Sequence, residues 1–145
     1  MKTLLIIPAY NEEESLVATI ESVQEVVPEI DFLIINDGSK DNTVKICREH
    51  QYPFVDLSTN LGLAGGFQTG MKYAYRHGYD CAIQFDADGQ HLPQYIPVMM
   101  KAIESADIAI GSRFIDAKKP KSMRMLGSNL IEGAIKLTTC LLYTS

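Results

Sequence analysis

The chain has 145 residues, of which 46% are hydrophobic and 21% are charged, and its formal net charge is −5. This composition is typical of one soluble globular domain that can bury a core of its own. The acidic balance argues against a general nucleic-acid-binding protein, which would need an excess of lysine and arginine.

The cysteines and the start of the chain indicate a location. Cys47, Cys81 and Cys140 have neither the spacing of a metal site nor that of a disulfide framework, so we expect free thiols in a reducing compartment. The first residues show no feature of a signal peptide, and no stretch approaches the ~20 apolar residues that span a bilayer. We therefore expect a cytoplasmic protein.

The end of the chain differs from the rest. Residues 140–145 interrupt a helical pattern without a cap and match one reading frame of a common sequencing adapter. We expect them to be a non-native read-through tail. The predicted domain then covers residues 1–139 and is the N-terminal part of a longer protein.

Strands and helices alternate from the start. Residues 3–7 form a continuous apolar run, typical of a strand covered on both faces, and Pro8 is expected to end its pairing. Asn11 and Glu14 have the spacing of a capping box, so a helix is predicted from there to Pro28.

The next units repeat this order. A second buried strand is predicted at residues 32–35, followed by a turn at 37–39, a helix that includes residues 44–47, and a short third strand at 54–57. Residues 60–66 are expected to form a flexible glycine-rich loop.

The remaining units continue the alternation. A helix is predicted after the glycines, with Gly78 as its C-terminal stop, and a fourth strand at residues 81–83. Pro93 should open a helix to about residue 105, at a position where proline is favoured. A fifth strand is predicted at 108–110, and a last helix at about 123–138. This order predicts an α/β fold with a mostly parallel sheet and helices on both faces.

Polar residues gather where the predicted strands end. In a parallel sheet these ends share one edge, where ligands bind. One or two such clusters would occur by chance, but four favour a real site. The clusters are Tyr10, Asn11 and Glu12 after the first strand, residues 37–39 after the second, 86–90 after the fourth, and Ser112 with Arg113 after the fifth.

The segment after the fourth strand has the features of a metal site. Asp86 and Asp88 are two residues apart at a strand end, so both side chains are expected to face a common point, and two adjacent carboxylates repel unless a cation or proton lies between them. Hard oxygen ligands suit Mg²⁺ or Mn²⁺, and Gln90 offers a further oxygen. The alternative is an ordinary polar loop, since Asp, Gly and Gln are common loop residues.

Other common site motifs are absent from the sequence. The glycines at 62–70 follow the third strand and do not form Gly-x-Gly-x-x-Gly, so a dinucleotide-binding dehydrogenase is not supported. A Gly-Lys-Ser/Thr phosphate loop is also missing. His50 and His77 fall near helix ends, whereas His91 adjoins the carboxylates, where either a structural role or contact with the site is open.

Five segments together resemble family-2 glycosyltransferases of the GT-A fold, nearest to the dolichyl-phosphate mannosyltransferase-like and bacterial polysaccharide branch. Each segment is weak evidence alone, but their order and spacing agree with the family over residues 1–139. The segments are IPAYNEE (7–13), INDGSKDNT (35–43), NLG (60–62), DADGQH (86–91) and GSRF (111–114).

The resemblance implies roles in binding a nucleotide-sugar donor. Asp37 would hydrogen-bond the base, and Arg113 would meet a phosphate of the donor or of a phospholipid acceptor. The residues bordering the nucleoside would be Pro8, Ala9, Tyr10 and Glu12. The ligands of a Mg²⁺ or Mn²⁺ ion that bridges the donor diphosphate would be Asp86, Asp88 and Gln90, so that Asp86 serves both sets.

Each of these roles has a structural alternative. Residues 11–14 also fit a helix cap, which is compatible with donor binding, and Asp37 fits an Asx-type turn. Arg113 also fits a surface cation in a basic loop with Lys118, Lys119, Lys121 and Arg124. The last helix, with Leu130, Ile131 and Ile135 on one face, is expected to pack on the core or lie on a membrane.

The implied activity is transfer of a sugar from a nucleotide-diphospho-sugar to a lipid-phosphate or polysaccharide acceptor, with inversion. The general base of relatives lies in a later motif, beyond residue 139, so no base is assigned here. One alternative is therefore a catalytically incomplete fragment that binds nucleotide-sugar and metal. Another is a haloacid-dehalogenase-like phosphatase, since residues 86–89 resemble its Asp-x-Asp-Gly motif, although that motif normally follows the first strand. A lipid acceptor would place the protein at the inner face of a membrane.

Overall fold

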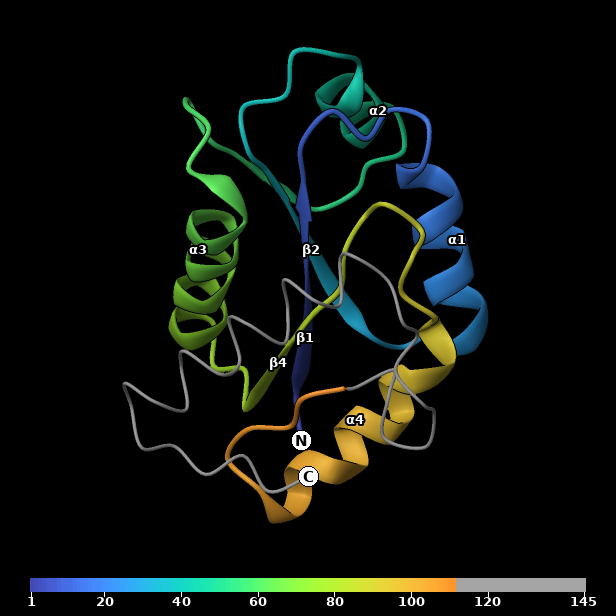
Figure 1. The fold of residues 1–145 in the computed structure, drawn as a ribbon, viewed down its shortest axis with the longest axis vertical. Helices are drawn as coiled ribbons and strands as arrows, with labels where there is room; N and C mark the ends of the chain where they lie inside the picture. Colours follow the sequence, from blue (N-terminus) through green and yellow to red (C-terminus); the bar gives the residue numbers. More distant parts are fainter. Residues whose placement is uncertain (112–145) are drawn as a thin grey trace, which may run out of the picture. The chain divides into compact units, whose positions relative to one another are not determined.

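Four parallel strands form the sheet in the part of the chain that the computed structural model describes, residues 1–111. The strands are β1 (Thr3–Ala9), β2 (Asp31–Asn36), β3 (Phe54–Asp56) and β4 (Cys81–Gln84). Their order is β3-β2-β1-β4, so β1 pairs with both β2 and β4 (Figure 1). The prediction of a parallel sheet is confirmed.

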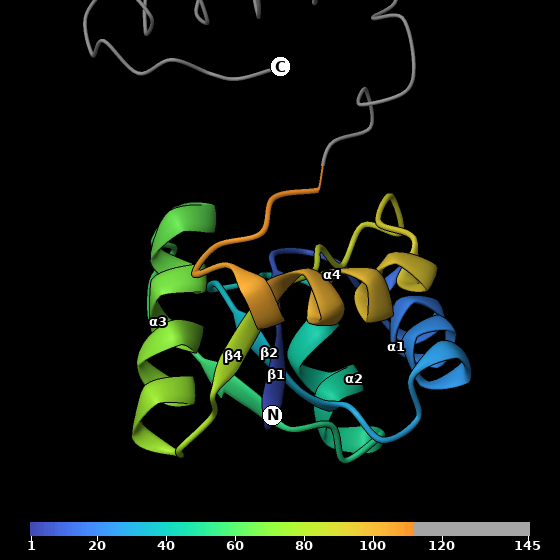
Figure 2. The ribbon, with the colours of Figure 1, turned by 90° about the horizontal axis from the view of Figure 1, so that it is seen from below.

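The helices enclose this sheet within a unit of residues 1–109. They are α1 (Leu16–Val26), α2 (Thr43–Glu49), α3 (Gly62–Arg76) and α4 (Ile96–Ala102), with 3₁₀ turns at Pro93–Tyr95 and Ile103–Ser105 on either side of α4. Figure 2 shows α3 on one side of the sheet and α1 on the other.

The continuous apolar run of β1 serves two cores at once. Leu5 and Ile7 pack with residues of α1, α2 and α4, whereas Leu4 and Ile6 pack in a second core that includes Ala74 of α3. Successive side chains of a strand point to opposite faces, so a strand between two helical layers must be apolar at every position. This arrangement leaves the loops at the strand ends free for polar residues.

The predicted fifth strand is wrong. Residues 108–110 form no strand, and the Ile108 side chain is 77% exposed. A run of three apolar residues does not by itself specify pairing, because a strand also needs a neighbour that offers its edge in register.

Pro8 does not end the pairing of β1, contrary to the prediction. The strand continues to Ala9, and Pro8 is in register with Ile35 of β2. The carbonyl of Ile6 accepts from Phe85 on the β4 side, and residues two apart point the same way, so the missing N–H of Pro8 would point past the end of β4. No ladder bond is lost there.

The capping box at Asn11 and Glu14 is also wrong. α1 begins at Leu16, and Asn11 has φ of +57° in the loop before it. The Asn11 side-chain oxygen instead accepts from the backbone N–H of Lys40 at 2.8 Å. A bond to a loop distant in sequence has therefore replaced the local cap.

The glycine-rich segment is helical rather than a flexible loop. α3 begins at Gly62, and Gly66 and Gly70 are buried within it. The predicted stop at Gly78 is confirmed, since Gly78 has φ of +68° directly after the C-cap residue His77. Glycine adopts this left-handed conformation without steric cost.

Some predictions concern residues 112–145, which lie outside the described part of the chain. They are the role of Arg113, the basic loop, the helix at 123–138, the domain end at 139 and the tail at 140–145. Within residues 1–111, none of the helices combines the length and the apolar character needed to cross a bilayer.

Candidate functional site

The carboxyl ends of the parallel strands place three predicted site residues at one edge of the sheet. Tyr10 follows β1, Asp37 follows β2, and Asp86 comes shortly after β4. The strand order reverses at β1, because β2 and β3 extend to one side of it and β4 pairs on the other. Open α/β sheets bind ligands outside the carboxyl ends of strands at such a switch point.

The loop after β1 is held by the loop after β2 through three successive backbone N–H groups. Those of residues 11–13 donate in turn to side-chain oxygens of Ser39, Thr43 and Asp41, at 2.9, 2.9 and 3.0 Å. In addition, the N–H of Lys40 donates to the side chain of Asn11. The two segments that carry the first two family-like motifs therefore form one hydrogen-bonded structure.

Asp41 is the centre of this structure. One carboxylate oxygen accepts from the N–H and the hydroxyl of Thr43, at 3.0 and 2.6 Å, and the other from the N–H of Glu13. Burial alone would raise the pKa of Asp41, but the hydrogen bonds from Thr43 and Glu13 outweigh it and hold the pKa below the usual 3.8. Asp41 is therefore kept ionised while it links the loops.

Asp37 binds the start of α3 instead of forming the Asx-type turn. Its two carboxylate oxygens accept from the N–H groups of Leu61 and Gly62, at 2.6 and 2.8 Å, and the residue is only 4% exposed. A negative charge is favourable at a helix N-terminus, where N–H groups lack partners. Gly38 permits this close approach, because a Cβ there would lie 3.1 Å from the backbone nitrogen of Asn60.

The acidic turn after β4 is anchored by its middle residue. Ala87 is 2% exposed, and its carbonyl accepts a hydrogen bond of 3.0 Å from the hydroxyl of Thr19 on α1. The neighbours Asp86 and Asp88 lie half-buried and exposed, respectively. α1 therefore fixes the position from which both carboxylates extend.

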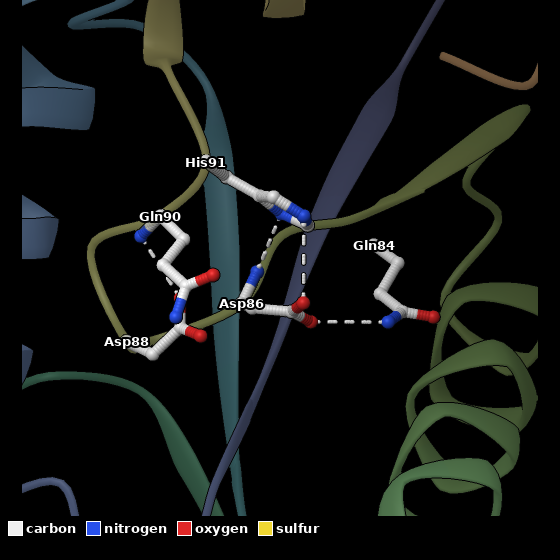
Figure 3. A network of polar contacts seen from close by, with 5 residues as sticks. All are labelled: Gln84, Asp86, Asp88, Gln90 and His91. Atoms are coloured by element: carbon white, nitrogen blue, oxygen red, sulfur yellow. Dashed lines mark hydrogen bonds and ion pairs between the residues drawn. The ribbon is translucent and has the colours of Figure 1, made fainter. Parts of the chain in front are cut away.

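The Asp86 carboxylate is directed at two side chains of its own segment. One oxygen accepts from the Gln84 amide at 3.0 Å, and the other lies 3.4 Å from Nε2 of His91. The Asp88 carboxylate instead accepts from the backbone N–H of Gln90 at 2.9 Å. In Figure 3 Asp86 turns toward Gln84 and His91, whereas Asp88 lies with Gln90 on the other side of the turn. The expectation that the two carboxylates face a common point is not met in this arrangement.

The donor atoms of the acidic turn still fit a divalent cation. Asp88 and Gln90 are exposed and provide hard oxygen atoms, which Mg²⁺ and Mn²⁺ prefer. Within residues 1–111, no group of three His, Cys, Asp or Glu side chains lies close enough to hold a metal. A cation here would therefore take its remaining ligands from substrate phosphate and water, as Mg²⁺ often does. Joint ligation by Asp86, Asp88 and Gln90 stays a prediction.

An open cleft of about 500 Å³ lies beside the acidic turn. It brings Asp88 together with Glu12, two of the predicted site residues, but Tyr10, Asp37 and Asp86 do not line it. Its lining consists of residues 11–15, Lys40, Asp41 and Asp88.

Sequence reasoning missed several residues that hold the site. Thr19 gave no signal beyond being a polar residue among apolar ones on a helix face. Asp41 and Thr43 carry a recognisable signal, since Asp followed two residues later by Thr often bonds its own backbone. His91 adjoins the carboxylates in the sequence, but no local pattern predicts its contacts with Asp86.

Comparison with known families identifies the chain. The family model described as "Glycosyl transferase family 2" matches residues 4–139, which is most of the chain. The chain belongs to this family.

Two curated relatives are glycosyltransferases named for polyprenyl-phosphate acceptors. The chain is 35% identical over 135 residues to an undecaprenyl-phosphate mannosyltransferase of Micrococcus luteus, covering 87% of this chain and 56% of the relative. It is 36% identical over 138 residues to the UDP-N-acetylglucosamine–dolichyl-phosphate N-acetylglucosaminyltransferase of Methanococcus voltae, covering 82% and 55%. The chain thus spans about half the length of the curated relatives it matches.

A solved structure supports the fold. The mannosyltransferase PcManGT from Pyrobaculum calidifontis, in complex with GDP-Man and Mn²⁺, matches with a TM-score of 0.62 at 16% identity, over 74% of this chain and 33% of that one. The predicted GT-A fold is confirmed. The phosphatase alternative loses its support, since the Asp-x-Asp-Gly segment follows the fourth strand and the family match is to glycosyltransferases.

Proposed function

We propose that this chain is a metal-dependent glycosyltransferase whose described residues bind the donor. The chain would transfer a sugar, with inversion, from a nucleotide-diphospho-sugar to a lipid-phosphate or polysaccharide acceptor. The observation that carries the proposal is the convergence of Tyr10, Asp37 and Asp86 at the carboxyl edge of the sheet, where the strand order reverses. The functions of the two relatives that act on polyprenyl phosphates support this substrate class.

The nucleoside would lie at the ends of β1 and β2. Residues 8 and 9 at the end of β1, together with Tyr10 and Glu12 on the loop after it, would border the nucleoside. Hydrogen bonds from the loop after β2 hold the backbone of residues 11–13 in place. Asp37 would accept a hydrogen bond from the base while it caps α3, because each carboxylate oxygen has two lone pairs and each has one protein donor. Arg113, outside the described residues, would meet a phosphate.

The diphosphate would lie over the acidic turn. Asp88 and Gln90 would provide oxygen ligands to Mg²⁺ or Mn²⁺, and Asp86 would join them by sharing an oxygen that now faces Gln84 or His91. When bound, the cation would stabilise the negative charge that develops on the departing nucleoside diphosphate. The contribution of this chain's residues is to hold the donor in one orientation for attack.

The reaction would be a direct displacement at the anomeric carbon. The acceptor oxygen attacks this carbon and the bond to the diphosphate breaks. The attacking atom is an ionised phosphate oxygen in a lipid phosphate, or a hydroxyl oxygen in a polysaccharide, and in the second case a general base takes the hydroxyl proton. None of the residues of this chain is assigned as the base. With a lipid-phosphate acceptor, the protein would act at the cytoplasmic face of a membrane.

A second candidate is that the chain binds donor and metal without catalysing transfer. The observation that favours it is the coverage, since the chain spans 56% and 55% of the two relatives. Residues from the remaining part of such a protein would then be needed for turnover, including a carboxylate base where the acceptor is a hydroxyl.

Calorimetry with GDP and UDP, with and without Mn²⁺, tests donor binding, and sugar transfer to a polyprenyl phosphate tests catalysis. We expect Mn²⁺-dependent binding of one nucleotide by the wild-type chain. Asp88→Asn should weaken it about tenfold or more by removing a charged ligand, with an unchanged melting temperature because Asp88 is exposed. Binding without transfer would favour the second candidate, whereas binding of neither nucleotide with Mn²⁺ would overturn both.

A further inference from the structure

His91 contacts both the backbone and the side chain of Asp86. Its Nδ1 accepts a hydrogen bond of 3.0 Å from the backbone N–H of Asp86, and its Nε2 lies 3.4 Å from a carboxylate oxygen of the same residue (Figure 3). One ring therefore spans the two parts of Asp86 that determine where its carboxylate points.

The backbone contact determines the tautomer of the ring. A backbone N–H can only donate, so Nδ1 of His91 must carry a lone pair, and in the neutral ring the proton is then on Nε2. That proton is on the nitrogen nearest the Asp86 carboxylate. At 3.4 Å this second contact is longer than an ordinary hydrogen bond, so in the neutral ring Nε2–H lies next to the carboxylate without a firm bond to it.

The ring itself is held in place by the core. His91 meets the ring of Phe85 edge to face, with 5.5 Å between centroids and an interplanar angle of 74°, and Phe85 is 4% exposed. Such aromatic pairs favour this geometry. The orientation of His91 therefore depends on a fixed neighbour.

Gln84 completes the arrangement from the strand side. Its amide donates to the second carboxylate oxygen of Asp86 at 3.0 Å, so each oxygen faces one nitrogen donor. The Asp86 and His91 side chains are 32% and 36% exposed, which leaves one side of the carboxylate open to solvent.

We propose that His91 is a positioning residue for Asp86: through Nε2–H it aims the carboxylate that meets the donor and its cation. This inference rests on the proposed function, since it assigns a role at the same site. Outer residues that orient ligands in this way typically contribute 10–100-fold to metal affinity.

Three substitutions separate the two contacts of His91. His91→Gln places an amide N–H where Nε2 lies, and so keeps a donor for the carboxylate. His91→Asn places an oxygen where Nδ1 lies, and so keeps the acceptor for the backbone N–H. His91→Phe removes both contacts and keeps an aromatic ring beside Phe85. The measurement is the affinity for Mn²⁺ with GDP or UDP, whichever the wild-type chain binds, together with the melting temperature.

We expect His91→Gln to bind close to the wild-type level, and His91→Asn and His91→Phe to bind about tenfold or more weakly. The melting temperatures should stay within about 5 °C of the wild type, because the backbone hydrogen bond from Asp86 is only partly buried. A His91→Phe chain that binds like the wild type would overturn the proposal. So would binding that His91→Asn restores and His91→Gln does not, because His91 would then only hold the backbone of the turn.

The tautomer gives a readout that does not depend on ligand. In ¹⁵N NMR spectra of histidine-labelled protein, we expect Nδ1 of His91 without a proton and Nε2 with one. A proton on Nδ1 would overturn the inference. If the wild-type chain bound neither nucleotide, the proposed function would fail, and this spectrum would still test whether Nδ1 of His91 is free to accept from the backbone N–H of Asp86.

Discussion

Gly70 of α3 provides a quantitative test of how closely that helix packs on the sheet. A Cβ at this position would lie 2.3, 2.9 and 3.0 Å from Cγ2, Cγ1 and Cδ1 of Ile6. Carbon atoms in contact are normally about 3.5–4.0 Å apart, so the overlap with Cγ2 exceeds about 1 Å. Ile6 is completely buried in the central strand β1, and its β-branched side chain has few χ1 rotamers to choose from.

The expected cost of Gly70→Ala follows from two opposing effects. Overpacking a core costs about 1–3 kcal/mol, whereas alanine gains about 1 kcal/mol over glycine in a helix interior. With three atoms of Ile6 in conflict, we expect the cost to prevail and the free energy of unfolding to fall by about 1–2 kcal/mol. The melting temperature should then fall by roughly 5 °C.

The matched control is Gly66→Ala, one turn earlier on the same face of α3. A Cβ there would lie 3.6 Å from Pro8 and 3.8 Å from Ile35, which are ordinary contacts. We therefore expect Gly66→Ala to raise the stability by about 0.5–1 kcal/mol. Urea denaturation of both variants measures the difference.

A double mutant identifies the cause. Ile6→Ala removes all three atoms that conflict with the new methyl group, so Gly70→Ala should lose most of its cost in that background. The reasoning is refuted if Gly70→Ala is as stable as Gly66→Ala, or if its cost is the same with and without the Ile6 side chain.

Two further predictions concern the contacts that hold the site. Thr19→Val should lower the free energy of unfolding by about 1–3 kcal/mol, because it leaves the buried carbonyl of Ala87 without its donor, and it should weaken Mn²⁺-dependent nucleotide binding by releasing the acidic turn. For Asp41, the folded pKa is lowered, so its stabilising effect is present above the unfolded pKa and is lost as the pH falls through the folded value. The stability difference between the wild type and Asp41→Asn should therefore be constant from pH 7 to pH 5 and shrink below about pH 4.

Each of these predictions has its own check. Thr19→Ser keeps the hydroxyl and should retain nucleotide binding, whereas equal binding by Thr19→Val and Thr19→Ser would contradict the role of the hydroxyl. For Asp41, denaturation curves at several pH values are compared, and a difference that persists unchanged well below pH 4 would show that the ionised carboxylate is not what joins the loops.

The alternation of apolar runs with helical patterns was enough to predict the α/β architecture. Leu4 to Ile7 are apolar at every position because the strand is covered on both faces, and period and length are local properties of a sequence. The stop at Gly78 and the proline at the start of the 93–95 turn also follow from local conformational preferences. The positions of Tyr10, Asp37 and Asp86 at one edge then follow from parallel strands alone.

The details of the site depend on partners far apart in the chain. The Asn11 side chain accepts from the backbone N–H of Lys40 and does not cap a helix. The Asp37 carboxylate accepts from the N–H groups of Leu61 and Gly62, where the glycine-rich segment begins α3. Neither contact can be predicted from the local sequence, because these partners become neighbours only when the strands pair. The three-residue run at 108–110 shows the converse, since an apolar run without a paired neighbour forms no strand.

The sequence by itself determined the order of elements as far as the helix that follows Pro93, the edge of the sheet that carries the polar residues, and the residue types available there. Only the tertiary structure decided where each carboxylate points: Asp86 toward Gln84 and His91, Asp88 toward the backbone of Gln90. The physical reason is that side chains two residues apart point the same way only in an extended strand. β4 ends at Gln84, so this rule does not apply to Asp86 and Asp88. Beyond that residue the turn, the bond from Thr19 and the ring of His91 set the geometry.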